Sequence, residues 1–577
     1  MKRCPECRRD YYDDTLLYCL EDGTSLVQGS VPSPDEPQTA ILHSTDFPSE
    51  AQTRAQIHTT EQTAVLPSGI AEVPKAKVFD KRLVLAPVAL AVIVLGGFFG
   101  YRYFAPAKQI ESIAVMPFVN ESKNEEVEYL SDGMTETLIN GLSQLPNLNV
   151  KGRSSVFRYK GKDMDTKTLG KELGVQAVLY GRVIQRGDQL TLSLELLDAV
   201  TENVIWSGKY DRKQADVVSL QSEIARDVSN NLKTKLSGAD AAKVEKEYTG
   251  DPEAYKLYLQ GRFYWNKRTA EDLKKSIGYF EQAIARDPGY ALAYSGLGAV
   301  YQVIPGYTSD PPPDVVYPKA RTASLKALEI DPTLAEPHAT LAVVLHEYDW
   351  NHPEAESEYK RAIELDPKYP SAHQWYGNFL TNMGRFKEGI SEQERAVELD
   401  PFSPIINANL ARAYRADRRY DDAIAQYKKT LEIAPNFQIA AFHLSRTYLL
   451  KGMYEEWSEQ ARRTMLSAGL QQAHVDTEIG ELKDLYRTSG PKAFWLKLLE
   501  RKLQDAKAGG RELDLYEIAV CQLGAGKKEE ALDTLEKGVA VGRGYYGILW
   551  LKAEPVWDPL RDEPRFKELL RKVGLPE

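Results

Sequence analysis

The residues best suited to chemistry lie at the start of the chain. Cys4 and Cys7 are separated by two residues, and Cys19 and Asp22 have the same spacing. Two turns that each supply two ligands can hold a tetrahedral zinc ion and organise a segment too short for its own core. We therefore predict structural zinc, with Asp22 as a weaker fourth ligand than cysteine. The alternatives are a metal-free vestige and a thiol pair that responds to oxidants.

The rest of the chain offers few groups for catalysis. No histidine lies between His58 and His338, and no cysteine lies between Cys19 and Cys521. The commonest bases and nucleophiles are therefore missing from the middle of the chain. Metalloprotease, serine-hydrolase and complete phosphate-loop motifs are absent as well. We predict that the protein is not an enzyme, and we identify no small-molecule substrate.

Length and charge narrow the class of protein further. A chain of 577 residues is too long for one core, and three or four folding units are expected. The net charge of −10 argues against a general nucleic-acid-binding protein.

The N-terminal hundred residues divide into three parts by composition. Residues 1–26 carry the metal-ligand pairs and resemble a small zinc ribbon. Residues 27–80 are rich in Pro, Ser, Thr and Gln and predict a disordered linker. The run Leu83–Tyr101 has no charged residue, and at about 1.5 Å per residue it can cross a hydrocarbon core of about 30 Å. We therefore predict a transmembrane helix over 83–104.

Basic residues around this run predict its orientation. Four precede it, namely Lys75, Lys77, Lys81 and Arg82, whereas only Arg102 and Lys108 closely follow. Such a bias places the N-terminus in the cytoplasm. The expected location is the bacterial inner membrane, with one span and the bulk of the chain outside the cytoplasm.

Residues 110–236 mix the two kinds of periodicity. Leu190, Leu192, Leu194 and Leu196 alternate with polar residues, which is typical of a half-buried strand. An apolar residue then recurs every fourth position on one helical stripe, at Leu220, Ile224, Val228 and Leu232. The segment is predicted to be a mixed α/β domain.

This domain resembles a known bacterial family. The runs Tyr129-Leu-Ser-Asp-Gly-Met-Thr-Glu, Tyr180-Gly-Arg-Val and Trp206-Ser-Gly-Lys-Tyr-Asp211 are similar to the TolB-like N-terminal domain. That domain accompanies tetratricopeptide repeats in class III adenylate cyclases and winged-helix transmembrane regulators. The resemblance implies a sensory or binding domain and not a catalytic one. Neither a cyclase domain nor a winged helix is present in this chain.

A repeat ending in proline fills the C-terminal half. Pro288, Pro332, Pro367, Pro401 and Pro435 each close a phrase such as Glu-Leu-Asp-Pro, and the last two intervals are 34 residues. This period indicates stacked helical hairpins. Small residues at the expected helix crossings, Gly298, Ala342, Gly377 and Ala411, strengthen the resemblance to tetratricopeptide repeats. We predict an all-α solenoid with a C-terminal helical cap over 251–577.

The resemblance also implies a binding groove. In that family the first helix of each repeat lines a concave surface, and four positions of that helix point into it. The matching residues here are His346, Gln374, Asn378, Arg412, Arg415 and Arg446. Arginines on such a surface can pair with carboxylates of a peptide ligand. The alternative is that these side chains only solvate the face.

Together these observations predict a multidomain protein-interaction scaffold or signalling component that is anchored in a membrane. Its expected partners are proteins or peptides, including acidic ones, and no nucleic acid is expected. An envelope assembly or trafficking factor is the first alternative. An enzyme with an unrecognised carboxylate site is the second.

Overall fold

The computed structural model divides the chain into two compact units, Met1–Phe104 and Ala105–Glu577. It describes three two-residue strands of the first unit and most of the second unit: 2–3, 10–11, 27–28, 110–122, 127–145, 147–232, 246–509, 514–542 and 546–577. In the first unit, β1 (Lys2–Arg3) pairs antiparallel with both β2 (Asp10–Tyr11) and β3 (Val27–Gln28).

Two predictions fall on the first unit. The predicted zinc ligands Cys4, Cys7, Cys19 and Asp22 and the predicted span 83–104 lie outside the described residues. In the part of the chain that the structure describes, no helix is both long and apolar enough to cross a bilayer. This finding contradicts the predicted single-pass location in the inner membrane, and that prediction is withdrawn.

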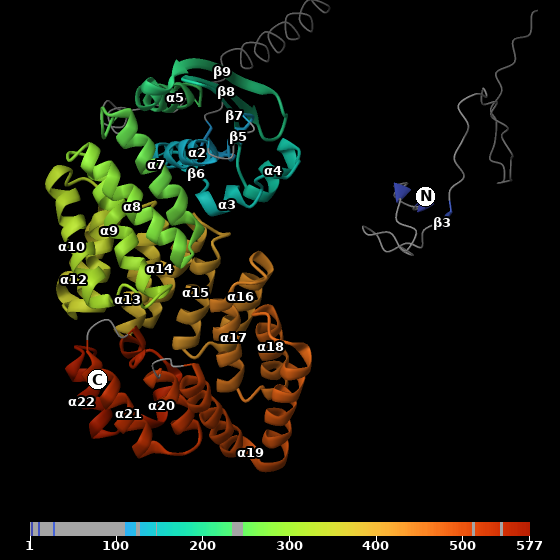
Figure 1. Cartoon of the computed structure of the whole chain (residues 1–577), viewed down its shortest axis with the longest axis vertical. Helices are drawn as coiled ribbons and strands as arrows, with labels where there is room; N and C mark the ends of the chain where they lie inside the picture. The colour runs from blue at the N-terminus through green and yellow to red at the C-terminus, as the bar shows by residue number, and fades with distance from the viewer. Residues whose placement is uncertain are drawn as a thin grey trace, which may run out of the picture. The chain divides into compact units, whose positions relative to one another are not determined.

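The second unit begins with the predicted mixed α/β domain (Figure 1). Its sheet has the order β6-β4-β7-β8-β9, with β5 also paired to β7. The bounds of these strands are β4 (Ser112–Val115), β5 (Val119–Asn120), β6 (Asn149–Val150), β7 (Ala177–Arg186), β8 (Gln189–Asp198) and β9 (Val204–Lys213). β4 runs parallel to β6 and β7, whereas β7, β8 and β9 are antiparallel. The four alternating leucines of β8 are buried, as the sequence pattern predicts.

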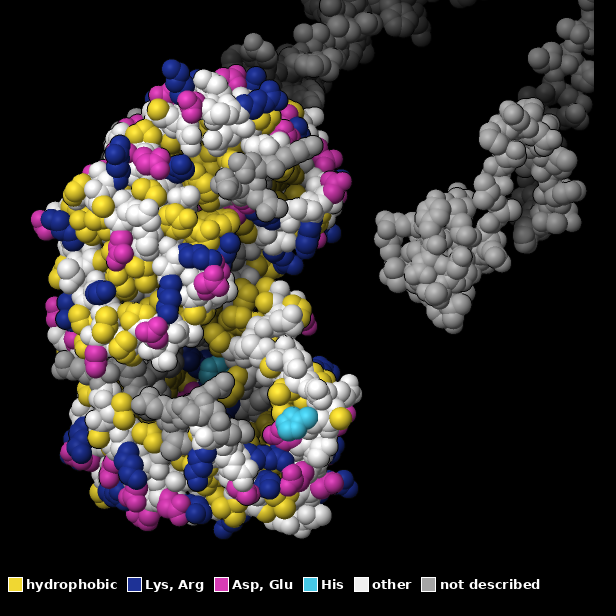
Figure 2. All heavy atoms as spheres, in the orientation of Figure 1, with side chains coloured by type: hydrophobic (Ala, Val, Ile, Leu, Met, Phe, Trp, Pro, Cys, Tyr) yellow, Lys and Arg dark blue, Asp and Glu magenta, His cyan; other side chains and the backbone are white. Residues whose placement is uncertain are grey.

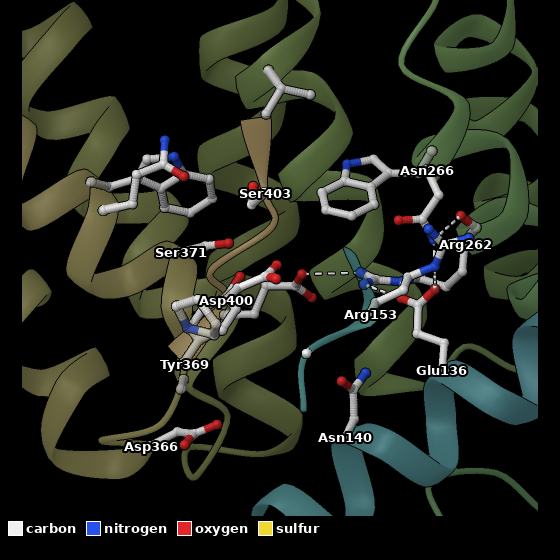
Figure 3. Close-up of a pocket in the computed structure, with 18 of the residues that line it drawn as sticks. Glu136, Asn140, Arg153, Arg262, Asn266, Asp366, Tyr369, Ser371, Asp400 and Ser403 are labelled. Atoms are coloured by element: carbon white, nitrogen blue, oxygen red, sulfur yellow. Dashed lines mark hydrogen bonds and ion pairs between the residues drawn. The ribbon is translucent and has the colours of Figure 1, made fainter. Parts of the chain in front are cut away.

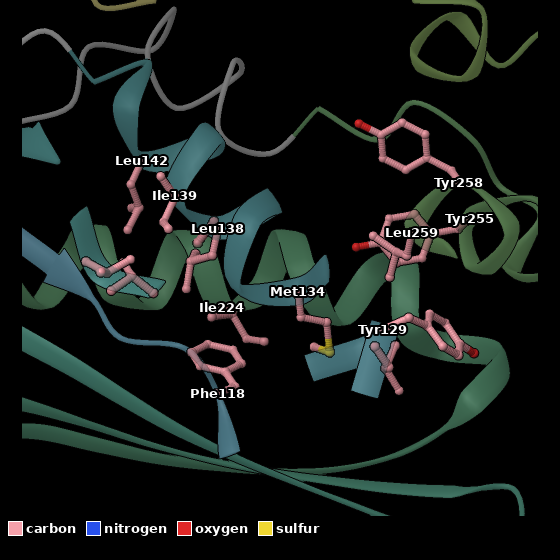
Figure 4. Packing of buried hydrophobic residues seen from close by; sticks show 14 of the residues in the cluster. Phe118, Tyr129, Met134, Leu138, Ile139, Leu142, Ile224, Tyr255, Tyr258 and Leu259 are labelled. Carbon is pink, nitrogen blue, oxygen red and sulfur yellow. The ribbon is translucent and has the colours of Figure 1, made fainter. Parts of the chain in front are cut away.

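The described residues of this domain also form the α-helices α2 (Glu128–Ser143), α3 (Arg153–Phe157), α4 (Thr166–Leu173) and α5 (Val217–Asn231). Figure 4 shows side chains of α2 and α5 meeting over the sheet, with Leu138 and Ile224 near Phe118. The same core continues through Met134 to Leu259, which belongs to the first helix of the solenoid. Gly133 permits this contact, since a Cβ there would lie 2.9 Å from Leu259. The α/β domain therefore shares a core with the repeats.

The predicted solenoid follows as a series of helical hairpins, α7/α8 to α17/α18 (Figure 1). The helices are α7 (Pro252–Lys267), α8 (Ala270–Arg286), α9 (Ala291–Val303), α10 (Pro313–Ile330), α11 (Ala335–Val344), α12 (His352–Leu365), α13 (Pro370–Asn382), α14 (Phe386–Leu399), α15 (Pro404–Ala416), α16 (Tyr420–Ile433), α17 (Gln438–Leu450) and α18 (Tyr454–Ser467). The small residues lie at helix crossings, as predicted. A Cβ on Gly298 would lie 2.6 Å from the hydroxyl of Ser324.

The remaining helices turn back toward the middle of the solenoid. They are α19 (Gln472–Gly509), which is interrupted at Gly490, then α20 (Leu515–Gly524), α21 (Lys528–Val541), η5 (Tyr546–Trp550), η6 (Pro555–Leu560) and α22 (Pro564–Lys572). Leu549 and Trp550 pack with Ala416 of α15, and His352 of α12 contacts the carbonyl of Val573. The last part of the chain thus packs against repeats that precede it by more than a hundred residues.

Candidate functional site

A cavity of about 2230 Å³ lies between the α/β domain and the concave side of the solenoid. One wall comes from α2 and the start of α3, which contribute Asn140 and Arg153. The facing wall comes from the first helices of successive repeats, α7 to α17, and from the turns that precede them. Figure 3 shows side chains of both walls pointing into the same space. This cavity is large enough for a peptide or another extended ligand.

A buried ionic network fixes the two walls to each other. Arg262 of α7 donates to Glu136 of α2 at 2.6 Å and to Glu336 of α11 at 3.1 Å. Arg153 and Asn266 also contact the Glu136 carboxylate, at 3.2 and 2.5 Å (Figure 3). Burial alone would raise the pKa of the Glu136 carboxyl. The nearby guanidiniums of Arg262 and Arg153 have the larger combined effect and hold this pKa below its ordinary value. The cavity is therefore preformed.

A second set of contacts uses the aspartates of the repeat turns. In four successive turns the aspartate before the proline accepts a hydrogen bond from the preceding part of the chain. The pairs are Thr249 with Asp287, Lys246 with Asp331, Gln144 with Asp366, and Ser155 with Asp400, at 2.6, 2.7, 3.0 and 3.0 Å. The fifth turn has Ala434 at this position, whose side chain cannot accept such a bond. The repeat phrase therefore carries aspartate where the turn meets the α/β domain or the segment that links it to the solenoid.

Burial raises the pKa of two carboxyl groups of the cavity wall above the ordinary value. It raises the pKa of Asp400 to about 6, although Ser154, Ser155 and Arg153 act in the opposite direction. It also raises the pKa of Glu347 to about 7, against the hydrogen bond from Tyr317. These two groups change charge near neutral pH.

The six residues predicted to line the groove fall into two sets. Gln374, Asn378 and Arg412 line the cavity. The other three lie elsewhere. His346 is buried and contacts His352 and Asn382 through its two ring nitrogens, at 3.1 and 3.0 Å. That the six side chains bind a partner stays a prediction.

The C-terminal part of the chain, from α20 onward, contacts all three of the predicted arginines. Arg415 is fully buried and forms an ion pair with Glu554. Arg446 pairs with Glu517 of α20 at 3.0 Å, and the guanidinium carbon of Arg412 lies 3.6 Å from the centre of the Trp550 ring. Carboxylates do meet Arg415 and Arg446, but they come from the same chain. Sequence reasoning missed Glu554 and Trp550 because the segment after α21 carries no periodic signal that places it beside α15.

Charges of both signs are interspersed over the face of the molecule in Figure 2, and no basic field extends across it. Nucleic-acid-binding surfaces concentrate Lys and Arg on one face. The face drawn in Figure 2 has no such concentration.

Comparison with known families adds a finding on the α/β domain. Residues 108–227 match the family described as HilA/YgeH-like transcriptional regulator, second domain. The domain therefore matches a HilA-like family and not the TolB-like family that the sequence motifs predicted. We call it the HilA-like domain from here on.

Two further matches concern the solenoid. Residues 358–390 and 408–441 each match a tetratricopeptide repeat family. The chain therefore contains tetratricopeptide repeats, as its proline spacing predicts. Such repeats are typical of protein-interaction scaffolds.

A curated relative from Rhizobium meliloti (strain 1021), provisionally named adenylate cyclase 3, is 32% identical over 245 residues. The match covers 42% of this chain and 40% of that protein, so the chain spans less than half the length of the relative. Solved structures of similar fold include a tetratricopeptide repeat protein of Thermus thermophilus, with 20% identity over 34% of this chain and 99% of that one, at a TM-score of 0.30. PilF of Pseudomonas aeruginosa is similar at 22% identity over 41% and 96% of the two chains, at a TM-score of 0.29.

Proposed function

We propose that this chain is a protein-interaction component of a signalling or regulatory system, and that it binds a peptide segment of its partner in the cavity. The cavity between the HilA-like domain and the repeats carries this proposal. It is preformed, because the Glu136 and Arg262 network joins its walls. A preformed site spares the ligand part of the cost of ordering the protein.

The lining of the cavity supports a peptide ligand. Aromatic side chains from the repeats include Tyr255, Tyr258, Trp265, Tyr290, Tyr369 and Trp375. Amides and hydroxyls, such as Gln374, Asn378, Ser371 and Ser403, lie among them. Apolar rings with a few fixed polar groups suit the alternation of side chains and backbone in a peptide.

The regulatory setting rests on the relatives. One matching family is described as a transcriptional regulator, and the curated relative is named as a cyclase. Both names belong to proteins that pass on a signal. We propose the same general role for this chain, with binding in the cavity as its input.

A soluble library of random octapeptides tests the proposal. The full chain is incubated with the library, and the retained peptides are identified by mass spectrometry. We expect the Ser371→Trp variant, which fills the cavity, to lose the retained set. Ser391→Trp is the control, since Ser391 is exposed on α14 and does not line the cavity. If the wild type retains nothing, or Ser371→Trp retains the same set, the proposal fails.

The same experiment separates binding from catalysis. Glu347 is the observation that favours an enzyme, because a carboxyl group with a pKa of about 7 can act as a general acid or base. A peptide-cleaving enzyme would return shortened peptides from the library. We expect the retained peptides to be intact.

A further inference from the structure

Arg268 stands apart from the other cations of the cavity. It follows the last residue of α7, in the left-handed conformation with φ of 56°, and it lines the cavity. Its guanidinium carbon lies 3.7 Å from the centre of the Trp265 ring. It forms no hydrogen bond or ion pair with any residue that the structure describes, whereas Arg153, Arg262 and Lys246 each pair with a carboxylate.

The nearby carboxylates already have partners. Both oxygens of Glu136 are used, one by Arg262 and the other by Arg153 and Asn266. Glu336 accepts from Arg262 with one oxygen and from Ser295 with the other, at 2.6 Å. Burial lowers the pKa of Arg268, which is the expected response of a cation that lacks a counter-charge. Among the residues that the structure describes, no carboxylate forms an ion pair with Arg268.

The cavity lining holds two more polar atoms without partners among the described residues. The indole nitrogen of Trp265 and the side-chain oxygen of Gln302 are buried and make no hydrogen bond there. Both residues line the cavity. Most buried polar atoms in folded proteins are paired. Because Trp265 contacts Arg268, the unpaired indole nitrogen marks this part of the lining as one that a bound molecule can complete.

Exposed apolar side chains also line the cavity. Ile405 at the start of α15 and Ile439 at the start of α17 line it and are 37% and 41% exposed. Phe442, further along α17, is 45% exposed. The cavity thus offers a ligand both a cation and an apolar surface.

We propose that the cavity binds a linear peptide whose carboxylate pairs with Arg268 and whose apolar side chains cover Ile405 and Ile439. This inference rests on the proposed function and names the chemistry of the ligand. A carboxylate matches the single charge of Arg268, whereas a doubly charged phosphate would exceed it and would face Glu336. The carboxylate belongs to an Asp or Glu side chain or to the end of the peptide.

The experiment uses the octapeptide library in two forms, half with a free C-terminal acid and half with a C-terminal amide. Full-length wild type, Arg268→Gln, Arg268→Lys and Lys267→Gln are compared. Lys267 is the matched control, because it is exposed, adjacent and outside the cavity lining. Melting temperatures check that every variant is folded.

We expect the wild type to enrich Asp and Glu over Asn and Gln at one position, or the acid form over the amide, by about tenfold or more. Arg268→Gln loses this enrichment, while Arg268→Lys retains part of it and Lys267→Gln all of it. The first kind of enrichment identifies a side-chain carboxylate and the second identifies a chain end. A second measurement needs no variant. The affinity of the wild type for one retained peptide is compared with its affinity for the same peptide with the carboxylate replaced by Gln or by a C-terminal amide, and we expect the peptide with the carboxylate to bind more tightly.

Failure of the role of Arg268 and failure of the proposed function give different results. Retained peptides with no preference for a carboxylate, or with the same preference on Arg268→Gln, overturn the role of Arg268 and leave the proposed function standing. A wild type that retains no peptide overturns both.

Discussion

The guanidinium of Arg415, in α15, forms a fully buried ion pair with Glu554, which lies 139 residues further along the chain. A second nitrogen of the same group lies 3.2 Å from a ring nitrogen of His443. This pair joins the middle of the solenoid to its last segment. The stability of the C-terminal half therefore depends on contacts between residues far apart in the chain.

Removing one partner of the pair is expected to be costly. Glu554→Gln leaves the Arg415 charge buried without a counter-ion, and we expect a loss of about 3–5 kcal/mol in the free energy of unfolding. Urea titration followed by tryptophan fluorescence measures it, because Trp550 and Trp557 lie in the same segment. The double variant Arg415→Met with Glu554→Leu should recover most of the loss.

The control is a neighbouring exposed pair. Asp558 contacts Arg418, and both side chains are about a third or more exposed. Asp558→Ala should cost less than about 1 kcal/mol. Equal losses for Glu554→Gln and Asp558→Ala would mean that burial does not distinguish the two pairs.

A second loss of stability is expected on substitution of Gly377, which lies at the crossing of α13 and α14. A Cβ there would lie 2.9 Å from the amide of Gln393 and 3.0 Å from the carbonyl of Gly389. We expect Gly377→Leu to destabilise the protein by about 1–3 kcal/mol through overpacking. Gly278→Leu is the comparison, because nothing lies within 4 Å of a Cβ at Gly278 in α8. Thermal melting of both variants decides whether the crossing needs glycine, and equal melting temperatures would show that it does not.

The raised pKa of Asp400 predicts how the free energy of unfolding changes with pH. Burial raises its folded-state pKa from 3.8 to about 6, so between these values the folded state holds the proton more tightly than the unfolded state. Asp400 therefore lowers the stability as pH rises from about 4 to 6, and its effect is constant above that. Relative to the wild type, Asp400→Asn should gain about 1–3 kcal/mol of stability over this range.

Denaturation of both proteins at pH 4, 5, 6 and 7 measures this difference. Subtracting the two curves isolates Asp400 from all other titrating groups. A difference that stays constant with pH, or that falls as pH rises, contradicts the assignment.

The zinc site at Cys4, Cys7, Cys19 and Asp22 stays a proposal, and metal analysis tests it. We expect about one zinc ion per full-length chain, in the manner of structural sites with four ligands. Cys4→Ser should remove most of the metal, whereas Cys521→Ser should not, because Cys521 is buried in α20. Wild-type protein without zinc, or a Cys4→Ser variant that keeps it, would rule the site out.

The repeats could be read from the sequence because their signals are local. Proline ends each hairpin, and a small residue marks each crossing, so neighbouring residues fix both the period and the fold. The alternating leucines of β8 and the stripe of α5 are equally local. For this reason the mixed α/β domain and the solenoid were predictable in kind.

The cavity could not be read in the same way. Its network joins Glu136 to Arg262 and Glu336, which follow it by more than a hundred positions and lie on two other helices. Arg415 and Arg446 were correctly placed on first helices of repeats, but no sequence pattern showed that Glu554 and Glu517 would meet them. Such contacts arise only when the whole chain has folded.

The hydrogen bond of 3.0 Å between His352 and the carbonyl of Val573 has a mechanical consequence. A solenoid held only by contacts between neighbours behaves as a spring, which stretches along its axis and frays one repeat at a time. Here α12 is also tied to Val573, the residue that follows α22, so the repeats between them are held by a contact beyond those between neighbours. Fraying of these repeats therefore requires this contact to break as well. Pulling on this part of the chain should therefore meet high resistance followed by a single rupture.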